Sequence, residues 1–69
     1  MGTFKVKDFV GVSRKTFSDT YRDAIRQAKT VVPGDIGGVE VSPPFYVVIT
    51  ENREIEFRST VRIVYETDD

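Results

Sequence analysis

Apolar and polar residues alternate from Ile55 to Glu66, and this long alternation constrains the fold more than any other feature of the sequence. Odd-numbered positions carry mostly apolar side chains, whereas even-numbered positions carry mainly charged or hydroxyl groups, with Val64 as the apolar exception. A period of two residues places successive side chains on opposite faces of a β-strand. The segment is therefore predicted to be a long strand with one apolar and one polar face.

A helical period appears earlier in the chain, after Thr16. Apolar residues recur there mostly three or four positions apart, at Phe17, Tyr21, Ala24, Ile25, Ala28 and Val32. This spacing predicts an amphipathic helix, with Thr16 capping its first turn and Pro33-Gly34 ending it. The charged face of this helix is interpreted as solvated surface, and a docking surface is the alternative.

Two further segments have the character of strands. Residues 3–12 alternate loosely and predict a first strand. Residues 39–49 predict one long strand, interrupted near Pro43-Pro44 because proline removes backbone donors from the ladder and favours a sheet edge or a bulge. Residues 51–54 are polar and predict a turn into the last strand.

The order of these elements, β-α-β-β, predicts an α+β fold. A right-handed crossover between the first two strands leaves a slot between them, which the last strand fills antiparallel to both. We therefore expect a three-stranded antiparallel-type sheet of order 1-3-2 that partly wraps one amphipathic helix, in a single domain over residues 1–69. The helix is expected to pack on one face of the sheet, with Phe17, Tyr21, Ile25 and Ala28 against Phe57, Val61 and Ile63. The other face carries Tyr46, Val48 and Val64, and is more apolar than a free surface requires.

The composition excludes several classes of functional site. The 69 residues include no Cys and no His, which excludes disulfides, thiolate or imidazole metal sites, and Ser-His-Asp or Cys-His catalysis. Since no pair of carboxylates has a spacing typical of acid–base catalysis, we predict a non-enzymatic protein without catalytic or metal-binding residues. The formal net charge of −1 argues against a nucleic-acid partner. No apolar run is long enough to target or span a membrane, and a cytoplasmic location is predicted.

The small size of the chain favours self-association. A domain this short buries only about 60% of the surface that its unfolded chain exposes, and such domains usually gain stability from disulfides, metals or partner subunits. Because Cys and His are absent, association with further copies of the chain is the remaining route. The sequence therefore predicts a homo-oligomer.

Four segments, in this order and at this spacing, resemble the dodecin family. They are Val10-Gly11-Val12-Ser13, Ala24-Ile25-Arg26-Gln27-Ala28, Val39-Glu40-Val41 and residues 57–66, and the resemblance runs from Phe4 to Glu66. Dodecins are β-α-β-β proteins that assemble as hollow spherical dodecamers and hold flavins in pairs at symmetry-related interfaces, as binders or buffers rather than catalysts. The resemblance implies a homododecamer that binds or stores a small molecule, with FMN or riboflavin as the cofactor.

Two positions depart from the family pattern in the part of the chain that holds the flavin. The family's stacking tryptophan falls at Gly38, when one inserted residue is allowed in the preceding loop, and the chain contains no Trp. The family's flavin-pairing glutamine falls at Arg58, whose guanidinium has donors but no acceptor for the ring N–H. A guanidinium suits phosphate or carboxylate, so this change implies a related anionic ligand.

The candidate cofactor-binding residues are therefore Gly38, Phe45, Tyr46 and Arg58, with Phe45 and Tyr46 as replacements for the missing aromatic surface. Each has a structural alternative. Gly37-Gly38 is then a turn into the second strand, Arg58 is solvated or bridges subunits, and Phe45 and Tyr46 are packing or interface residues. The corresponding alternative function is a flavin-free dodecin-like shell or interaction protein.

Overall fold

Strand β3 (Ile55–Thr67) forms the centre of the sheet in this computed structural model, which describes residues 2–68 apart from the side chains of residues 42–44. It pairs antiparallel with β1 (Thr3–Ser13) on one side and with β2 (Asp35–Ile49) on the other, so the strand order is β1-β3-β2. Helix α1 (Phe17–Val31) is the crossover from β1 to β2. The predicted α+β fold, element order and sheet order are confirmed. No helix in the described part of the chain is long and apolar enough to cross a membrane.

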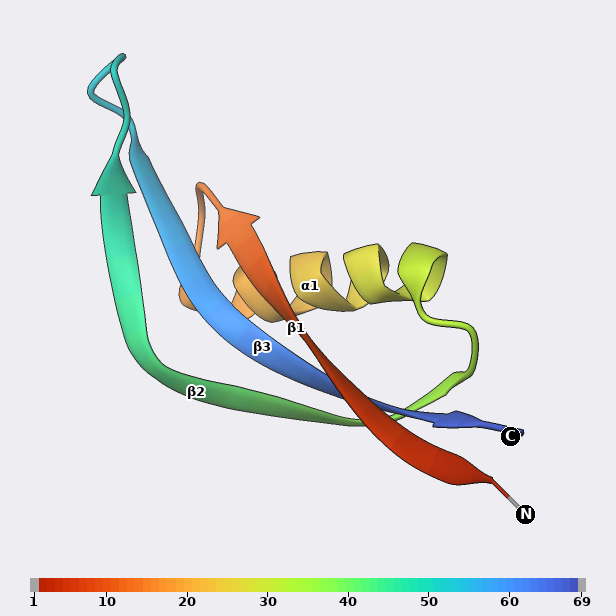
Figure 1. The fold of residues 1–69 in the computed structure, drawn as a ribbon. Helices are drawn as coiled ribbons and strands as arrows, with labels where there is room; N and C mark the ends of the chain where they lie inside the picture. The colour runs from red at the N-terminus through yellow and green to blue at the C-terminus, as the bar shows by residue number, and fades with distance from the viewer. Residues whose placement is uncertain (1, 69) are drawn as a thin grey trace.

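The sheet is curved, and α1 lies on its concave side (Figure 1). The turn between β2 and β3 projects beyond α1 and β1, and the molecule is elongated, with principal extents of 49 × 21 × 16 Å. The sheet thus partly wraps one helix, as predicted, and none of the described elements covers its opposite face.

Strand β2 differs from the prediction in its start and in its interruption. It begins at Asp35, before the expected residue 39, because β3 continues to Thr67 and supplies partners for this earlier segment. The expected interruption at the prolines is a shift of register between Ser42 and Tyr46 inside one continuous strand. An edge strand accommodates such an irregularity because only one of its sides is paired.

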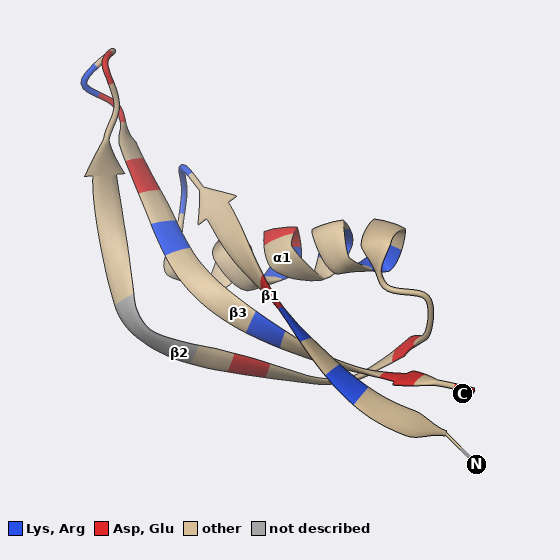
Figure 2. Ribbon diagram, in the orientation of Figure 1, with Lys and Arg blue, Asp and Glu red and all other residues tan. Residues whose placement is uncertain are grey.

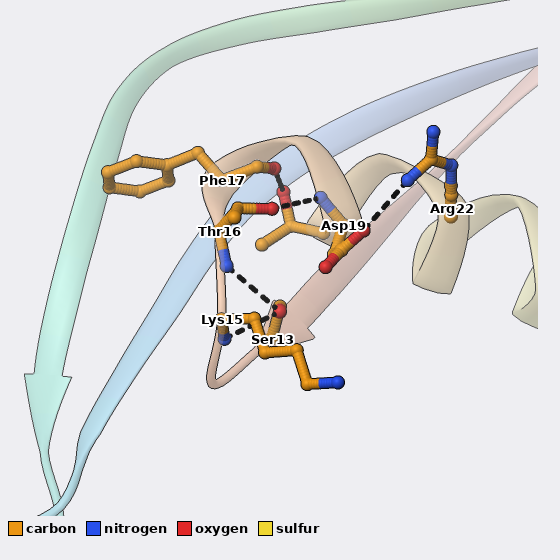
Figure 3. A network of polar contacts seen from close by, with 7 residues as sticks. Ser13, Lys15, Thr16, Phe17, Asp19 and Arg22 are labelled. Atoms are coloured by element: carbon orange, nitrogen blue, oxygen red, sulfur yellow. Dashed lines mark hydrogen bonds and ion pairs between the residues drawn. The ribbon is translucent and has the colours of Figure 1, made fainter.

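Helix α1 begins where the sequence predicts, and polar contacts hold its first turn (Figure 3). The Thr16 hydroxyl accepts a hydrogen bond from the Asp19 N–H at 3.1 Å, and the Ser13 hydroxyl accepts one from the Lys15 N–H at 3.0 Å. The Asp19 carboxylate lies 2.8 Å from the guanidinium of Arg22. The Thr16 contact satisfies a backbone donor that the first turn of a helix leaves without an internal partner, and the Ser13 contact holds the chain just before it.

The helix packs on the sheet through small side chains. The buried core consists of Ala24, Ala28, Val61 and Ile63. Partly buried side chains surround it, namely Phe9, Tyr21, Ile25, Val32, Ile36 and Val41. At the start of the helix the Phe17 ring contacts that of Phe57, with 4.8 Å between the ring centroids. The packing face that the helical period predicts is therefore confirmed.

The backbones of α1 and β1 lie close together at Gly11. A Cβ atom at this position would lie 1.8 Å from the carbonyl oxygen of Thr20, so only glycine fits without a shift of the helix. Beside this contact, the fully buried hydroxyls of Thr20 and Ser59 share a hydrogen bond of 2.6 Å. The pair gives two polar groups in the core a partner, as burial requires.

Asp23 ties α1 to the outer edge of β1. Its Oδ2 accepts hydrogen bonds of 2.9 Å from the Val12 N–H and from the Gln27 amide, which also donates to the Val10 carbonyl at 3.0 Å. Partial burial alone would raise the pKa of Asp23. The pKa nevertheless lies below its ordinary value of 3.8, because hydrogen bonds and a nearby charge outweigh burial. The hydrogen bonds come from Val12, Arg26 and Gln27, and the charge is that of Arg26.

The first prediction concerns this contact. Asp23→Asn is expected to lower the free energy of unfolding at pH 7 by about 1 kcal/mol, because the charged acceptor is lost. Folding lowers the pKa of Asp23, so the charged carboxylate stabilises the folded state at pH values above the pKa of the unfolded chain. This stabilisation is lost as the pH falls through the pKa of the folded chain. Urea denaturation of both proteins should show the difference shrinking between about pH 5 and pH 2. Asp19→Asn is the control on the same helix, and a difference that grows on acidification would contradict the assignment.

Candidate functional site

The candidate site residues lie mostly on the face of the sheet that points away from α1, here called the outer face. Even-numbered positions of β3 project to this face, because Ser59, Val61 and Ile63 project into the core. The strand register adds their neighbours, so the described side chains of the outer face are those of Phe4, Val6, Asp8, Val10, Val12, Asp35, Gly38, Glu40, Tyr46, Val48, Glu56, Arg58, Thr60, Arg62, Val64 and Glu66. Figure 2 shows charges of both signs spread along the strands, and Asp8 pairs with Arg62 at 3.0 Å.

Tyr46 and Arg58 are brought together at the end of the outer face near the β2–β3 turn. They are register partners across β2 and β3. Arg58 donates a hydrogen bond of 2.9 Å to Glu56, and this bond is the main reason that the pKa of Arg58 is raised. The charge of Glu56 and the neighbouring Tyr46 act in the same direction, whereas desolvation acts in the opposite one. Arg14 lies 2.7 Å from Glu54 and 4.0 Å from Glu56. The guanidinium of Arg58 is thus already paired, and an anionic ligand would compete with Glu56 for it.

One atom of Arg58 has no partner in the described part of the chain. Its Nε is buried and makes no hydrogen bond, although the whole side chain is 36% exposed. A buried donor without an acceptor costs free energy. Because the chain already covers this Nε, a ligand or another copy of the chain reaches it only if the neighbouring side chains move.

Gly38 lies at the opposite end of the outer face. It is the register partner of Val64, six residues along β3 from Arg58, which corresponds to about 20 Å of strand. Gly37 and Gly38 are inside β2, at a second shift of register that follows Ile36, and not in a turn before the strand. The alternative interpretation of the glycines as an entry turn is therefore wrong, because the strand starts earlier at Asp35.

Phe45 projects to the side of the sheet that faces α1. Its ring contacts that of Phe17, with 5.8 Å between centroids, and the side chain remains 47% exposed. Adjacent residues of a strand point to opposite faces, so Phe45 and Tyr46 do not line one surface of the same chain. The position of Phe45 agrees with a packing role. In the sequence this role is indicated by apolar residues at the odd-numbered positions Val41, Phe45 and Val47 of the strand.

Sequence reasoning did not single out two neighbours of the candidate residues. Glu56 is two positions before Arg58 on the same strand face, and this spacing is the signal for their contact. Phe4 is 66% exposed on the outer face near Gly37, and the sequence has no local signal for this proximity across three strands.

The described residues of a single chain enclose no pocket, so the candidate residues lie on an open surface. Among these residues, no group of three or more acidic side chains is placed to hold a metal ion.

Comparison with known proteins identifies the fold. No family model and no curated protein matches the sequence. Among solved structures, a dodecin from Streptomyces davaonensis is similar with a TM-score of 0.82 and 19% identity, covering 99% of this chain and 97% of its own. A tryptophan-to-phenylalanine variant of the Thermus thermophilus dodecin has a TM-score of 0.81 and 16% identity, with 100% of both chains covered.

A third similar structure is that of a dodecin that chelates calcium. It is the calcium-chelating dodecin of Mycobacterium tuberculosis, described as having a novel calcium-binding site, with a TM-score of 0.77, 20% identity, and coverage of 94% of this chain and 90% of its own. These likenesses span essentially the whole sequence and agree with the β-α-β-β order and the central position of β3. The chain therefore has the dodecin fold.

Proposed function

We propose that the chain assembles with copies of itself into a dodecin-like hollow dodecamer that binds a small molecule at the contacts between copies, without catalysing a reaction. The observation that carries this proposal is the outer face, which leaves apolar side chains uncovered on a chain with the dodecin fold. Val6 is 58% exposed, Val10 44% and Tyr46 40%. Surfaces of this kind are covered in assemblies or by ligands.

The positions of the candidate residues favour a ligand site shared between copies. Gly38 and Arg58 of one chain are separated by about 20 Å of strand. A ligand of flavin size that touches both kinds of position would therefore touch them in different copies. In this arrangement Tyr46 and Arg58 provide a polar end, and Gly38 with Val64 provides an apolar end.

The residues present fit a flavin only in part. A flavin offers both donors and acceptors on the polar edge of its ring, and Arg58 can serve the acceptors but not the ring N–H. The stacking surface that tryptophan would give is absent from the sequence. We propose weak binding of FMN or riboflavin, or binding of another flat or anionic ligand, as the function of the assembled protein.

A flavin-free shell or interaction protein is the second candidate. The hydrogen bond of 2.9 Å between Arg58 and Glu56 favours it, because the guanidinium is engaged within the chain and is not free for a ligand. In this case Arg58 would hold the strand surface in shape, and the outer face would be covered by other copies alone.

The second prediction tests assembly and ligand together. Native mass spectrometry of protein purified from cells grown with and without added riboflavin is expected to give a species near 94 kDa, twelve times the 7.8 kDa chain. Attached flavin masses would support the binding protein, and the same assembly without them would support the empty shell. A monomer of 7.8 kDa under both conditions would contradict both candidates.

A further inference from the structure

The end of the β2–β3 hairpin, residues 45–57, is called here the hairpin arm, and its turn projects beyond α1 and β1 (Figure 1). Hydrogen bonds fix the shape of this turn. The Thr50 carbonyl accepts one of 2.9 Å from the Arg53 N–H, and the Glu54 carbonyl accepts one of 2.9 Å from the Thr50 N–H. The Thr50 hydroxyl accepts a third, of 3.2 Å, from the Glu54 N–H. The hairpin arm therefore has a defined shape in the single chain.

The face of the hairpin arm on the helix side of the sheet is apolar. Its strand positions on this face carry Phe45, Val47, Ile49, Ile55 and Phe57. The ring of Phe17 covers Phe57 at the base of the arm. The other four side chains stay exposed, Phe45 and Val47 at 47%, Ile55 at 54% and Ile49 at 72%. Ile49 and Ile55 are register partners, so an uncovered apolar pair lies at the tip.

The charged groups beside this apolar face are already paired within the chain. Arg14 lies 2.7 Å from Glu54, and Arg58 lies 2.9 Å from Glu56. A partner that covers the apolar face therefore does not have to bring an opposite charge. An uncharged apolar surface of the same size and shape suits this face, and the hairpin arm of a second copy is such a surface. Contacts of this kind are self-complementary and have two-fold symmetry.

The area of the apolar face sets the setting in which such a contact forms. A stable interface buries about 800 Å² on each partner. The four partly exposed side chains supply about half of this area. The hairpin arm is therefore too small to hold two copies together alone. It is expected to act inside a larger assembly, in which the outer face supplies the remaining contacts.

We infer that the hairpin arms of two copies pack against each other through their apolar faces, around a two-fold axis. This inference rests on the proposed assembly and adds a second contact surface, which lies on the helix side of the sheet and not on the outer face. Removal of Val47, Ile49 and Ile55 from water in both copies provides the driving force. Near the axis of a two-fold contact, a residue meets its own counterpart in the other copy.

Cysteine cross-linking tests this symmetry directly. Because the chain contains no Cys, Val47→Cys, Ile49→Cys and Ile55→Cys each introduce a single thiol. A disulfide forms only where two equivalent positions come close together. At least one of the three variants is expected to give a covalent dimer with diamide at least tenfold faster than the matched control. The control is Val31→Cys, at an apolar position of α1 that is 51% exposed. Rates equal to the control in all three variants would overturn the inference.

A charged variant tests whether the apolar contact supports the assembly. Ile49→Lys with Ile55→Glu places opposite charges on register partners, which keeps the formal net charge at −1 and favours the hairpin. In the contact these charges would lose water, so the assembled fraction in native mass spectrometry is expected to fall at least tenfold. Ile49→Val with Ile55→Val is the matched control and should assemble like the wild type. Assembly of the charged variant to the level of this control would overturn the inference.

The same measurements separate this inference from the proposed function. If the wild-type protein assembles, the charged variant assembles equally and no thiol cross-links faster than the control, the arm contact is wrong and the proposed function stands. A wild-type monomer of 7.8 kDa would contradict both. A wild-type dimer that the charged variant abolishes would support the arm contact and contradict the dodecamer. Circular dichroism of the charged variant shows that its fold is retained.

Discussion

Gly11→Ala is expected to lower the free energy of unfolding by about 3 kcal/mol or more, a large part of the stability of a chain this small. The added Cβ would lie 1.8 Å from the Thr20 carbonyl oxygen and 2.7 Å from its carbon. Both are backbone atoms of α1, so no side-chain rotation relieves the clash. The helix would have to move away from β1, which also separates the buried hydroxyls of Thr20 and Ser59. Urea denaturation followed by circular dichroism measures the loss.

The same substitution elsewhere in the chain gives a matched control. At Gly38 the added Cβ makes only ordinary contacts with Val64, the shortest at 3.7 Å, and alanine there is expected to change stability by less than about 1 kcal/mol, in the stabilising direction. Gly34→Ala resembles Gly11→Ala, since its Cβ would lie 1.7 Å from the Glu66 carbonyl oxygen. Equal stabilities of the Gly11 and Gly38 variants would mean that α1 does not pack on β1 as described.

The parts of the fold that could be predicted are those encoded by local periods. The alternation through β3 and the helical period of α1 each arise from one buried face, and the crossover rule then fixes the strand order. The start of β2 could not be predicted in this way, because Asp35 and Ile36 join the strand through long-range pairing with the end of β3. The register shift before Gly38 also changes which side chains share a face, and no local pattern marks such a shift.

Local periods also explain why only part of the candidate site can be predicted from the sequence. Alternation places Tyr46 and Arg58 on the outer face, and the structure pairs them directly. Proximity in sequence groups Phe45 with Tyr46, but alternation assigns Phe45 to the opposite face, where it contacts Phe17. The position of Phe4 beside Gly37 depends on three strands lying side by side, and it becomes visible only in the folded chain.

The double variant Gly38→Trp with Arg58→Gln is expected to raise the affinity of the assembled protein for riboflavin by about 10- to 100-fold. A stacked aromatic side chain contributes about 1 to 3 kcal/mol per ring, and about 1.4 kcal/mol corresponds to a tenfold change in affinity. The Gly38 position has room for the first atoms of a new side chain. A planar indole at this position can lie along the outer face and present its own face to a flavin ring. Equilibrium dialysis against riboflavin measures the change.

The two single variants separate the contributions of stacking and pairing. Arg58→Gln gives the strand an amide with both a donor and an acceptor, and Glu56 keeps Arg14 at 4.0 Å as a neighbour after the loss of Arg58. Gly38→Trp alone should account for most of the gain, because stacking does not depend on the hydrogen-bond pattern at the other end of the outer face. If the double variant assembles but binds riboflavin no better than the wild type, the contact between copies has diverged from a flavin site. The outer face would then serve assembly alone, as in the flavin-free shell, or bind a ligand of another class.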